Sequence, residues 1–342
     1  MKNYLVTGGA GFIACNFVED LVSEGHRVVV LDALTYAGHM ENLLPVEGKI
    51  EFIHGDICDT SLVPLLFEKH RFDVVVNFAA ESHVDRSIEN AEAFIRTNVL
   101  GVGNLLQSAL RFWETQSDEY KSSFRFVQVS TDEVFGTLGD EGYFTEQTPY
   151  APNSPYSASK AGGDHLARAW YHTYRLPVIT TNCSNNYGPF QYPEKLIPYM
   201  IQCALSGKDL PVYGNGKNVR DWIHVKDHCH GIRLAIEKGD LGESYCFGGR
   251  SERQNLHVVE LICKVLDEVQ PRLDGRSYSE QIRFVEDRKG HDWRYAIDDS
   301  KAEKTLGFTR QYARFEDGLK DTVLWYLNNR DWVKKVLNDK PC

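Results

Sequence analysis

Short runs of β-branched and aromatic residues alternate, along the first half of the chain, with longer stretches whose apolar residues recur at helical spacing. The runs are apolar throughout, which is typical of strands in a parallel sheet covered by helices on both faces. They occupy residues 4–7, 27–32, 50–56, 73–80, 124–130 and 177–182. This rhythm predicts an α/β fold built on a doubly wound parallel sheet, and such sheets bind ligands at the carboxyl ends of their strands.

The rhythm changes after about residue 185, where segments punctuated by proline and glycine begin. A chain of 342 residues, 42% of them hydrophobic, is long enough for two domains. We therefore expect a Rossmann-type domain over residues 1–188, with a returning segment near 219–240. A smaller α/β domain over 189–342 would cover the ligand-binding edge of the sheet and bind the substrate.

Composition excludes several classes of protein. The net charge of −10 argues against a nucleic-acid partner. Eight cysteines without a CxxC pair indicate a reducing cytoplasm, and no apolar run reaches the roughly 18 residues of a membrane span. His224, His228, Cys229 and His230 lie close together, but no second group of ligands complements them, so we expect no metal.

A glycine-rich stretch, TGGAGFIA at residues 7–14, follows the first predicted strand and opens a helix. Its backbone N–H groups are suited to a pyrophosphate. Asp32 ends the second predicted strand, where a carboxylate binds ribose hydroxyls, and the neighbouring Ala33 offers no positive charge to a 2′-phosphate. With HGDI at residues 54–57 after the third strand, the pattern predicts an NAD site.

Tyr156 and Lys160 are four residues apart in YSASK, hence on one face of a predicted helix. A fixed cation, helped by the positive nicotinamide of NAD, favours the phenolate form of a nearby tyrosine. An isolated pair of this kind is usually a solvated helix face. Beside an NAD turn and the strand-end Ser130, however, the pair indicates hydride-transfer chemistry with Tyr156 as the base.

Two carboxylates, Asp132 and Glu133, stand side by side in STDEVFG at residues 130–136, directly after an apolar strand. Like charges this close either face water or do chemistry. Successive strand residues point to opposite faces, so both side chains reach one substrate only if the chain leaves the strand here.

These motifs together resemble the extended short-chain dehydrogenase/reductase family of nucleotide-sugar enzymes. Longer stretches resemble its 4,6-dehydratases over nearly the whole chain, namely residues 79–88, 182–189, 193–198, 210–228 and 287–298. The resemblance implies dTDP-glucose as substrate, tightly bound NAD and a homodimer. It does not separate thymine from uracil, which differ by one methyl group.

The resemblance also implies roles for five catalytic residues. Tyr156, with Thr131 on the same oxygen and Lys160 behind it, would take the proton of the C4 hydroxyl during oxidation to a ketone. Glu133 would then remove the acidified C5–H, and Asp132 would protonate the departing C6 hydroxyl.

Binding residues are implied in two sets. The cofactor set is Gly8, Gly11, Phe12, Ile13, Asp32, Asp56, Ile57, Ala79, Ala80, Ser130, Tyr156, Lys160 and Asn182. The substrate set is Ser82, His83, Thr131, Asn185, Glu194, Lys195, Leu196, Tyr213, Arg220, Asn255, Arg288, His291 and Tyr295. Among these, Arg220 and Arg288 would meet the diphosphate.

Some positions depart from the family pattern: Ala14 and Cys15 replace Gly-Ser, Phe135 replaces Tyr, and Lys289 replaces Pro. We expect effects on affinity rather than on the type of reaction. The alternatives are a 4-epimerase or decarboxylase of the same family, which does not need the Asp132–Glu133 pair, and a non-catalytic NAD-binding protein. The helices expected at 100–113 and 165–174 would form intramolecular core or a dimer bundle, and the family's dimers favour the second.

Overall fold

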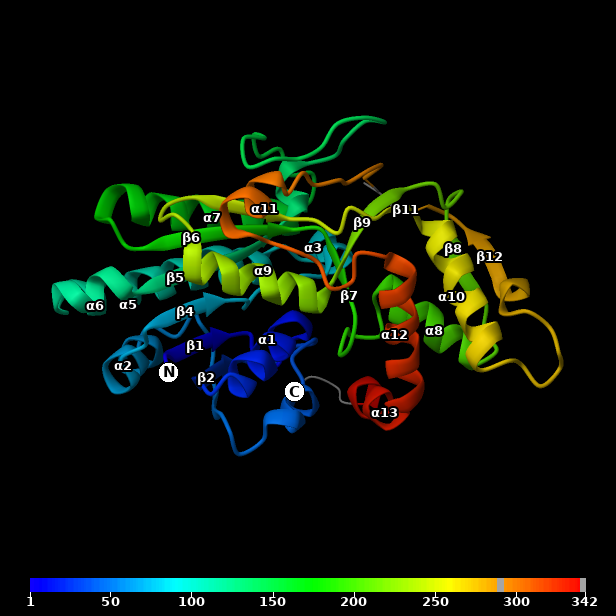
Figure 1. The fold of residues 1–342 in the computed structure, drawn as a ribbon, viewed down its shortest axis with the longest axis horizontal. Helices are drawn as coiled ribbons and strands as arrows, with labels where there is room; N and C mark the ends of the chain where they lie inside the picture. Colours follow the sequence, from blue (N-terminus) through cyan, green and yellow to red (C-terminus); the bar gives the residue numbers. More distant parts are fainter. Residues whose placement is uncertain (288–291, 339–342) are drawn as a thin grey trace.

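The six predicted strands are all present in the computed structural model, which describes residues 1–287 and 292–338 (Figure 1). A seventh joins them in one parallel sheet of order β10-β6-β5-β4-β1-β2-β3. The strands are β1 Asn3–Thr7, β2 Arg27–Asp32, β3 Glu51–His54, β4 Val74–Asn77, β5 Arg125–Thr131, β6 Val178–Cys183 and β10 Ser244–Phe247. The predicted Rossmann-type fold is confirmed.

Helices cover both faces of this sheet, as continuously apolar strands require. On one face lie α1 (Phe12–Ser23), α9 (Val225–Lys238) and α11 (Ser300–Leu306). On the other lie α2 (Leu62–His70), α5 (Val102–Glu114) and α7 (Pro155–Tyr174). Alternate residues of one strand serve opposite cores: Val6 packs with the first group and Leu5 with the second.

The apolar side of α5 packs inward, which is the intramolecular alternative for this helix. Leu105, Leu106 and Ala109 are fully buried in the same core as Phe67 and Phe126. The amphipathic pattern of this helix is therefore explained by one chain alone.

A second hydrophobic core lies at one end of the sheet (Figure 1). It is built by α8 (Leu196–Leu205), α10 (Asn255–Val269), α12 (Phe315–Asn328) and α13 (Arg330–Asn338). Short strands accompany these helices: β7 Asn185–Tyr187, β8 Leu210–Tyr213, β9 Val219–His224, β11 Glu252–Gln254 and β12 Ile282–Val285.

The chain returns to the first core after β9. Helix α9 packs on α1, β10 pairs with β6, and α11 packs on α9. We propose that the first domain comprises residues 1–188 together with 225–247 and 300–308, so that the expected returning segment is longer than 219–240. Within the described residues, no helix is both long enough and apolar enough to cross a membrane.

The remaining short helices connect these layers. They are η1 Met40–Val46, α3 Val84–Glu89, α4 Glu92–Ile95, the π-helical segment η2 Arg96–Gly101, α6 Asp118–Ser123, η3 Asp132–Phe135 and η4 Tyr278–Gln281.

Candidate active site

The turn between β1 and α1 brings the backbone unusually close to β4. Gly8 has a φ of +68°, and a Cβ there would lie 2.7 Å from the backbone N of Ala79. Both facts require glycine. No side chain caps α1 at Gly11, so the first N–H groups of the helix keep their capacity for an anion.

Asp32, at the end of β2, stabilises this turn by hydrogen bonds. Its two carboxylate oxygens accept hydrogen bonds from the backbone N–H of Ala10 (2.8 Å) and of Leu34 (2.7 Å). Burial raises the pKa of this carboxyl, and the two backbone bonds oppose the shift. Each oxygen has a further lone pair, so Asp32 remains able to accept a ribose hydroxyl.

The turn is also held from the far end of the sequence. The indole N–H of Trp332, on α13, donates to Asn42 Oδ1 at 2.8 Å. Asn42 Nδ2 in turn donates to the carbonyl of Ala10 at 2.7 Å. A helix of the second core is thus linked by two hydrogen bonds to the glycine-rich turn.

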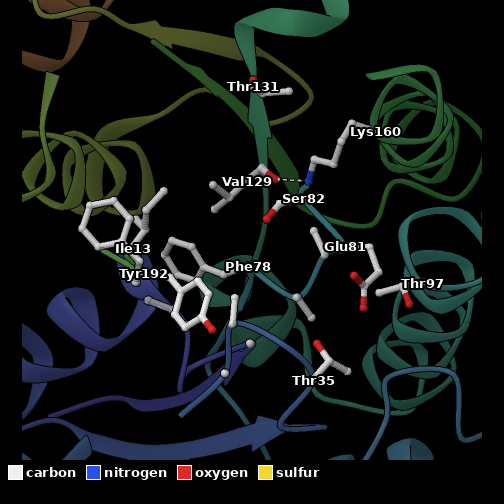
Figure 2. A pocket seen from close by; sticks show the side chains of 18 of the residues that line it. Ile13, Thr35, Phe78, Glu81, Ser82, Thr97, Val129, Thr131, Lys160 and Tyr192 are labelled. Atoms are coloured by element: carbon white, nitrogen blue, oxygen red, sulfur yellow. Dashed lines mark hydrogen bonds between the residues drawn. The ribbon is translucent and has the colours of Figure 1, made fainter. Parts of the chain in front are cut away.

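A cavity of about 340 Å³ runs from this turn to the ends of β4 and β5 (Figure 2). Its walls include most of the predicted cofactor residues: Gly8, Gly11, Phe12, Ile13, Asp32, Asp56, Ile57, Ala79, Ala80, Ser130, Tyr156 and Lys160. Asn182 is not on the wall, because its buried amide donates to the carbonyl of Thr131 at 3.0 Å. It supports the strand end.

The chain leaves the strand at Thr131, as the two carboxylates require. β5 ends there, and η3 begins at Asp132. The Thr131 hydroxyl accepts the backbone N–H of Glu133 at 3.2 Å and donates to Asp132 Oδ1 at 3.3 Å. Asp132 and Glu133 therefore both line the cavity.

The environments of the two carboxyl groups differ. Asp132 is 2% exposed, and burial followed by the charge of Glu133 raises its pKa well above the usual range. Glu133 lies at intermediate exposure. A deeply buried carboxyl with a raised pKa, next to a less buried one, can supply an acid and a base within reach of one substrate.

Helix α7 presents Tyr156 and Lys160 to the same cavity. It starts with a Ser154–Ser157 capping box and Pro155 in its first turn. Lys160 Nζ donates to the carbonyl of Val129 at 2.7 Å, the bond drawn in Figure 2.

Burial is the largest influence on the Tyr156 hydroxyl. Burial, and then the charge of Glu133, raise the pKa of Tyr156 well above its usual value, and a hydrogen bond with Thr131 opposes them. A phenol this buried needs a further positive charge in the cavity before it ionises.

The predicted substrate residues divide into two groups. Ser82, Thr131, Asn185, Glu194 and Lys195 lie on the cavity wall. His83 is not on the wall, but its Nε2 lies 3.5 Å from Oε2 of the wall residue Glu194.

The others lie outside the wall. Leu196 begins α8, Asn255 begins α10, and Tyr213 is 48% exposed at the end of β8. Arg220 is buried; its guanidinium donates to the carbonyls of Asp292 (3.0 Å) and Trp293 (3.4 Å) and lies over the ring of Tyr295. Arg288, Lys289 and His291 fall outside the described residues.

Sequence reasoning missed several residues on the wall, among them Thr35, Tyr36, Phe78, Glu81, Thr97, Cys183 and Tyr192. Tyr36 is fixed by contacts from distant segments: its hydroxyl is 3.1 Å from Ser82 Oγ, and the Arg86 guanidinium lies over its ring. Its position four residues after the end of β2 was the one available signal.

The site defines the class of nicotinamide-dependent dehydrogenases. It combines a parallel sheet with a glycine-rich turn, Asp32 at the end of β2 and a Tyr-Lys pair on α7. In agreement, the family described as GDP-mannose 4,6 dehydratase matches residues 5–322. A dTDP-glucose 4,6-dehydratase of Xanthomonas campestris pv. campestris (strain B100) is 58% identical over 340 residues, 99% of this chain and 97% of that one. The Escherichia coli dTDP-glucose 4,6-dehydratase is 48% identical, covering 98% and 96%.

Solved structures agree. The dTDP-glucose 4,6-dehydratase DesIV of Streptomyces venezuelae, solved with NAD, has a TM-score of 0.88 at 46% identity, covering 98% of this chain and 99% of that one. A UDP-glucose 4-epimerase of Thermotoga maritima has a TM-score of 0.86 at 26% identity, covering 96% and 99%. The chain belongs to the extended short-chain dehydrogenase/reductase family, in its 4,6-dehydratase branch.

Proposed function

We propose that this protein is a dTDP-glucose 4,6-dehydratase, which converts dTDP-glucose to dTDP-4-keto-6-deoxyglucose and water with NAD held throughout. The observation that carries the proposal is the placement of Asp132 and Glu133 on the wall of the cavity that also holds Tyr156 and Lys160. The fold alone does not decide, because an epimerase is almost as similar in structure as a dehydratase.

The described residues fit NAD. The uncapped end of α1 and the close approach of Gly8 to Ala79 suit the pyrophosphate, and Asp32 suits the adenosine ribose. When bound, NAD supplies the acceptor and later the donor of one hydride.

Oxidation at C4 requires removal of the hydroxyl proton. Tyr156 takes it, and Thr131, which is hydrogen-bonded to Tyr156, holds the same substrate oxygen. Lys160 lies behind this pair and keeps positive charge near the phenol. The product of this step is a 4-ketone.

Elimination then follows from the acidity of the C5–H next to that ketone. Glu133 accepts the C5 proton, and the C5–C6 double bond forms as the C6–O bond breaks. Asp132 gives its proton to the departing hydroxyl, which leaves as water. Hydride return to C6 and reprotonation of C5 complete the cycle.

Substrate recognition rests on residues that remain proposals. Ser82, Asn185, Glu194 and Lys195 line the same cavity as the two carboxylates, and Lys195 offers positive charge for the diphosphate. We retain Arg220 as a diphosphate ligand, which requires it to exchange its carbonyl partners at 292–293 for the phosphates. Tyr213, Asn255 and Tyr295 are proposed on the family pattern alone.

We further propose a cytoplasmic homodimer. The seven cysteines among the described residues are all free, as expected in a reducing compartment. Ile88, Ile95 and Leu100, which are each more than half exposed, follow one another along α3, α4 and η2. Burial of these side chains against a second copy would explain their exposure.

The test is to incubate the purified protein with dTDP-glucose and no added reductant. We expect a product lighter by one water, with the absorbance of a 4-keto-6-deoxysugar in alkali. A parallel incubation with UDP-glucose tests whether the protein prefers thymine or uracil in the nucleotide. In parallel, Glu133→Gln should abolish the loss of water, while a product of unchanged mass in wild type would instead indicate an epimerase.

A further inference from the structure

Helix α7 carries a third buried polar side chain in line with the catalytic pair. Tyr156, Lys160 and Asp164 follow at four-residue intervals, so they share one helix face. Their exposed fractions are 8%, 5% and 3%. The proposed reaction uses the first two and gives Asp164 no role. Because a buried carboxylate is costly unless it is compensated, its presence calls for a reason.

Asp164 ties α7 to the catalytic end of β5. Its Oδ2 accepts the hydroxyl of Ser130 at 2.5 Å and that of Tyr150 at 3.1 Å. Lys160 donates to the carbonyl of Val129, the residue just before Ser130. Two consecutive residues of β5 are therefore held by two consecutive turns of α7, immediately before Thr131.

The two charges on this face also depend on each other. Burial lowers the pKa of Lys160, and Asp164 is the main influence that opposes the shift. Burial raises the pKa of Asp164, and Lys160 is the main influence that opposes that shift. The other titratable group facing Lys160 is Cys183 on β6, and those facing Tyr156 are Glu133 on η3, Cys183 and Tyr36.

We propose that Asp164 is a positioning residue: its carboxylate holds the Ser130 end of β5 and keeps Lys160 charged, and so maintains the cation one helical turn from Tyr156. This inference rests on the proposed function for its catalytic meaning. The interaction between the two charges does not depend on that function, because Asp164 and Lys160 are buried one helical turn apart whatever the substrate.

The first test is the pH dependence of kcat for Asp164→Asn. Without the carboxylate, Lys160 loses its proton at lower pH, so the basic limb of the profile should move down by about one pH unit or more. Asp164→Glu keeps the charge and should restore much of the wild-type limb. Tyr150→Phe is the matched control: it removes a hydrogen bond from the same oxygen but no charge, and should leave the limb in place. An unmoved limb in Asp164→Asn would overturn the proposal.

The second test is independent of turnover and uses thermal unfolding. Asp164→Asn and Lys160→Met each leave one buried charge without its partner and should each lower Tm. The double variant removes both charges and should be at least as stable as Lys160→Met alone. Additive losses in Tm would show that the two side chains are not coupled.

The two tests separate the possible failures. If Asp164→Asn alone does not fold, the comparison of Tm between Lys160→Met and the double variant still shows whether the two charges are coupled. If the wild type releases no water from dTDP-glucose, the proposed function fails, whereas the unfolding cycle continues to report on the pair.

Discussion

Two adjacent glycines in the catalytic helix should respond in opposite ways to alanine. Gly162 and Gly163 both lie inside α7, where Gly→Ala ordinarily stabilises a helix by about 1 kcal/mol. A Cβ on Gly163, however, would lie 2.5 Å from the backbone carbonyl oxygen of Asn98. A Cβ on Gly162 would lie 3.1 Å from Val99 Cγ2, and that side chain can shift.

The magnitudes follow from these contacts. Overpacking against a fixed carbonyl costs about 1–3 kcal/mol, so Gly163→Ala should be destabilising by about 1 kcal/mol after the helix gain is subtracted. Gly162→Ala should keep up to about 1 kcal/mol of gain, which puts the two variants about 2 kcal/mol apart. With an unfolding entropy of about 2.1 cal/mol/K per residue, 342 residues convert this to about 3 °C in Tm.

Activity should separate the variants more clearly than stability. Asn98 Nδ2 donates to Ser159 Oγ at 2.8 Å, so a displacement of Asn98 is passed to the helix between Tyr156 and Lys160. Since small misplacements are costly in catalysis, kcat of Gly163→Ala should fall about tenfold or more, and that of Gly162→Ala should stay near wild type. Differential scanning calorimetry and a dehydration assay measure both quantities. Equal stabilisation by the two alanines would refute the close-approach argument.

Three further predictions concern the acid, the turn and the C-terminal helix. Asp132→Asn should abolish dehydration yet raise Tm at neutral pH by the equivalent of about 1 kcal/mol or more. The folded-state pKa of Asp132 lies above its unfolded value, so the wild type loses stability as the pH rises from the unfolded to the folded pKa. The gain in Tm should therefore vanish below about pH 4, where Asp132 is protonated in both states. A gain that does not change with pH would contradict this. Gly8→Ala should purify without NAD, because its Cβ meets the backbone at Ala79; retention of NAD at the wild-type level, measured by absorbance after denaturation, would count against it. Trp332→Phe removes the bond to Asn42 and should lower Tm by about 1–2 °C and speed NAD loss, whereas Trp325→Phe, whose indole N–H makes no hydrogen bond among the described residues, should not speed NAD loss.

The strands were predictable because a parallel sheet buried on both faces leaves a strong local signal. Val28, Val29 and Val30 are all buried, and so are Val74, Val75 and Val76. β10 was missed because SYCF is short, lacks β-branched residues and reaches its partner β6 only after the intervening helix α9. Its membership in the sheet is a matter of tertiary topology rather than local pattern.

The site was predictable where the spacing of residues in a short motif fixes their relative positions. Tyr156 and Lys160 follow from helical spacing, and the turn at Thr131 follows from the needs of two adjacent carboxylates. The surroundings of Arg220 did not follow from any local pattern, because its partners at 292–293 lie more than 70 residues away. For the same reason, the burial that raises the Tyr156 pKa was not visible in YSASK. The departure at Phe135 is explained: its ring stacks on Phe144 and meets the edge of Tyr150 in a small apolar cluster.

The link from Trp332 through Asn42 to Ala10 bears on the order in which the protein is made. The glycine-rich turn leaves the ribosome about 320 residues before its support from α13, and the seventh strand of its sheet follows some 240 residues after it. A nascent chain therefore lacks the complete cofactor turn until α13 has been made. Cofactor capture should then wait for that helix, and fragments that stop before it should be unable to sequester NAD.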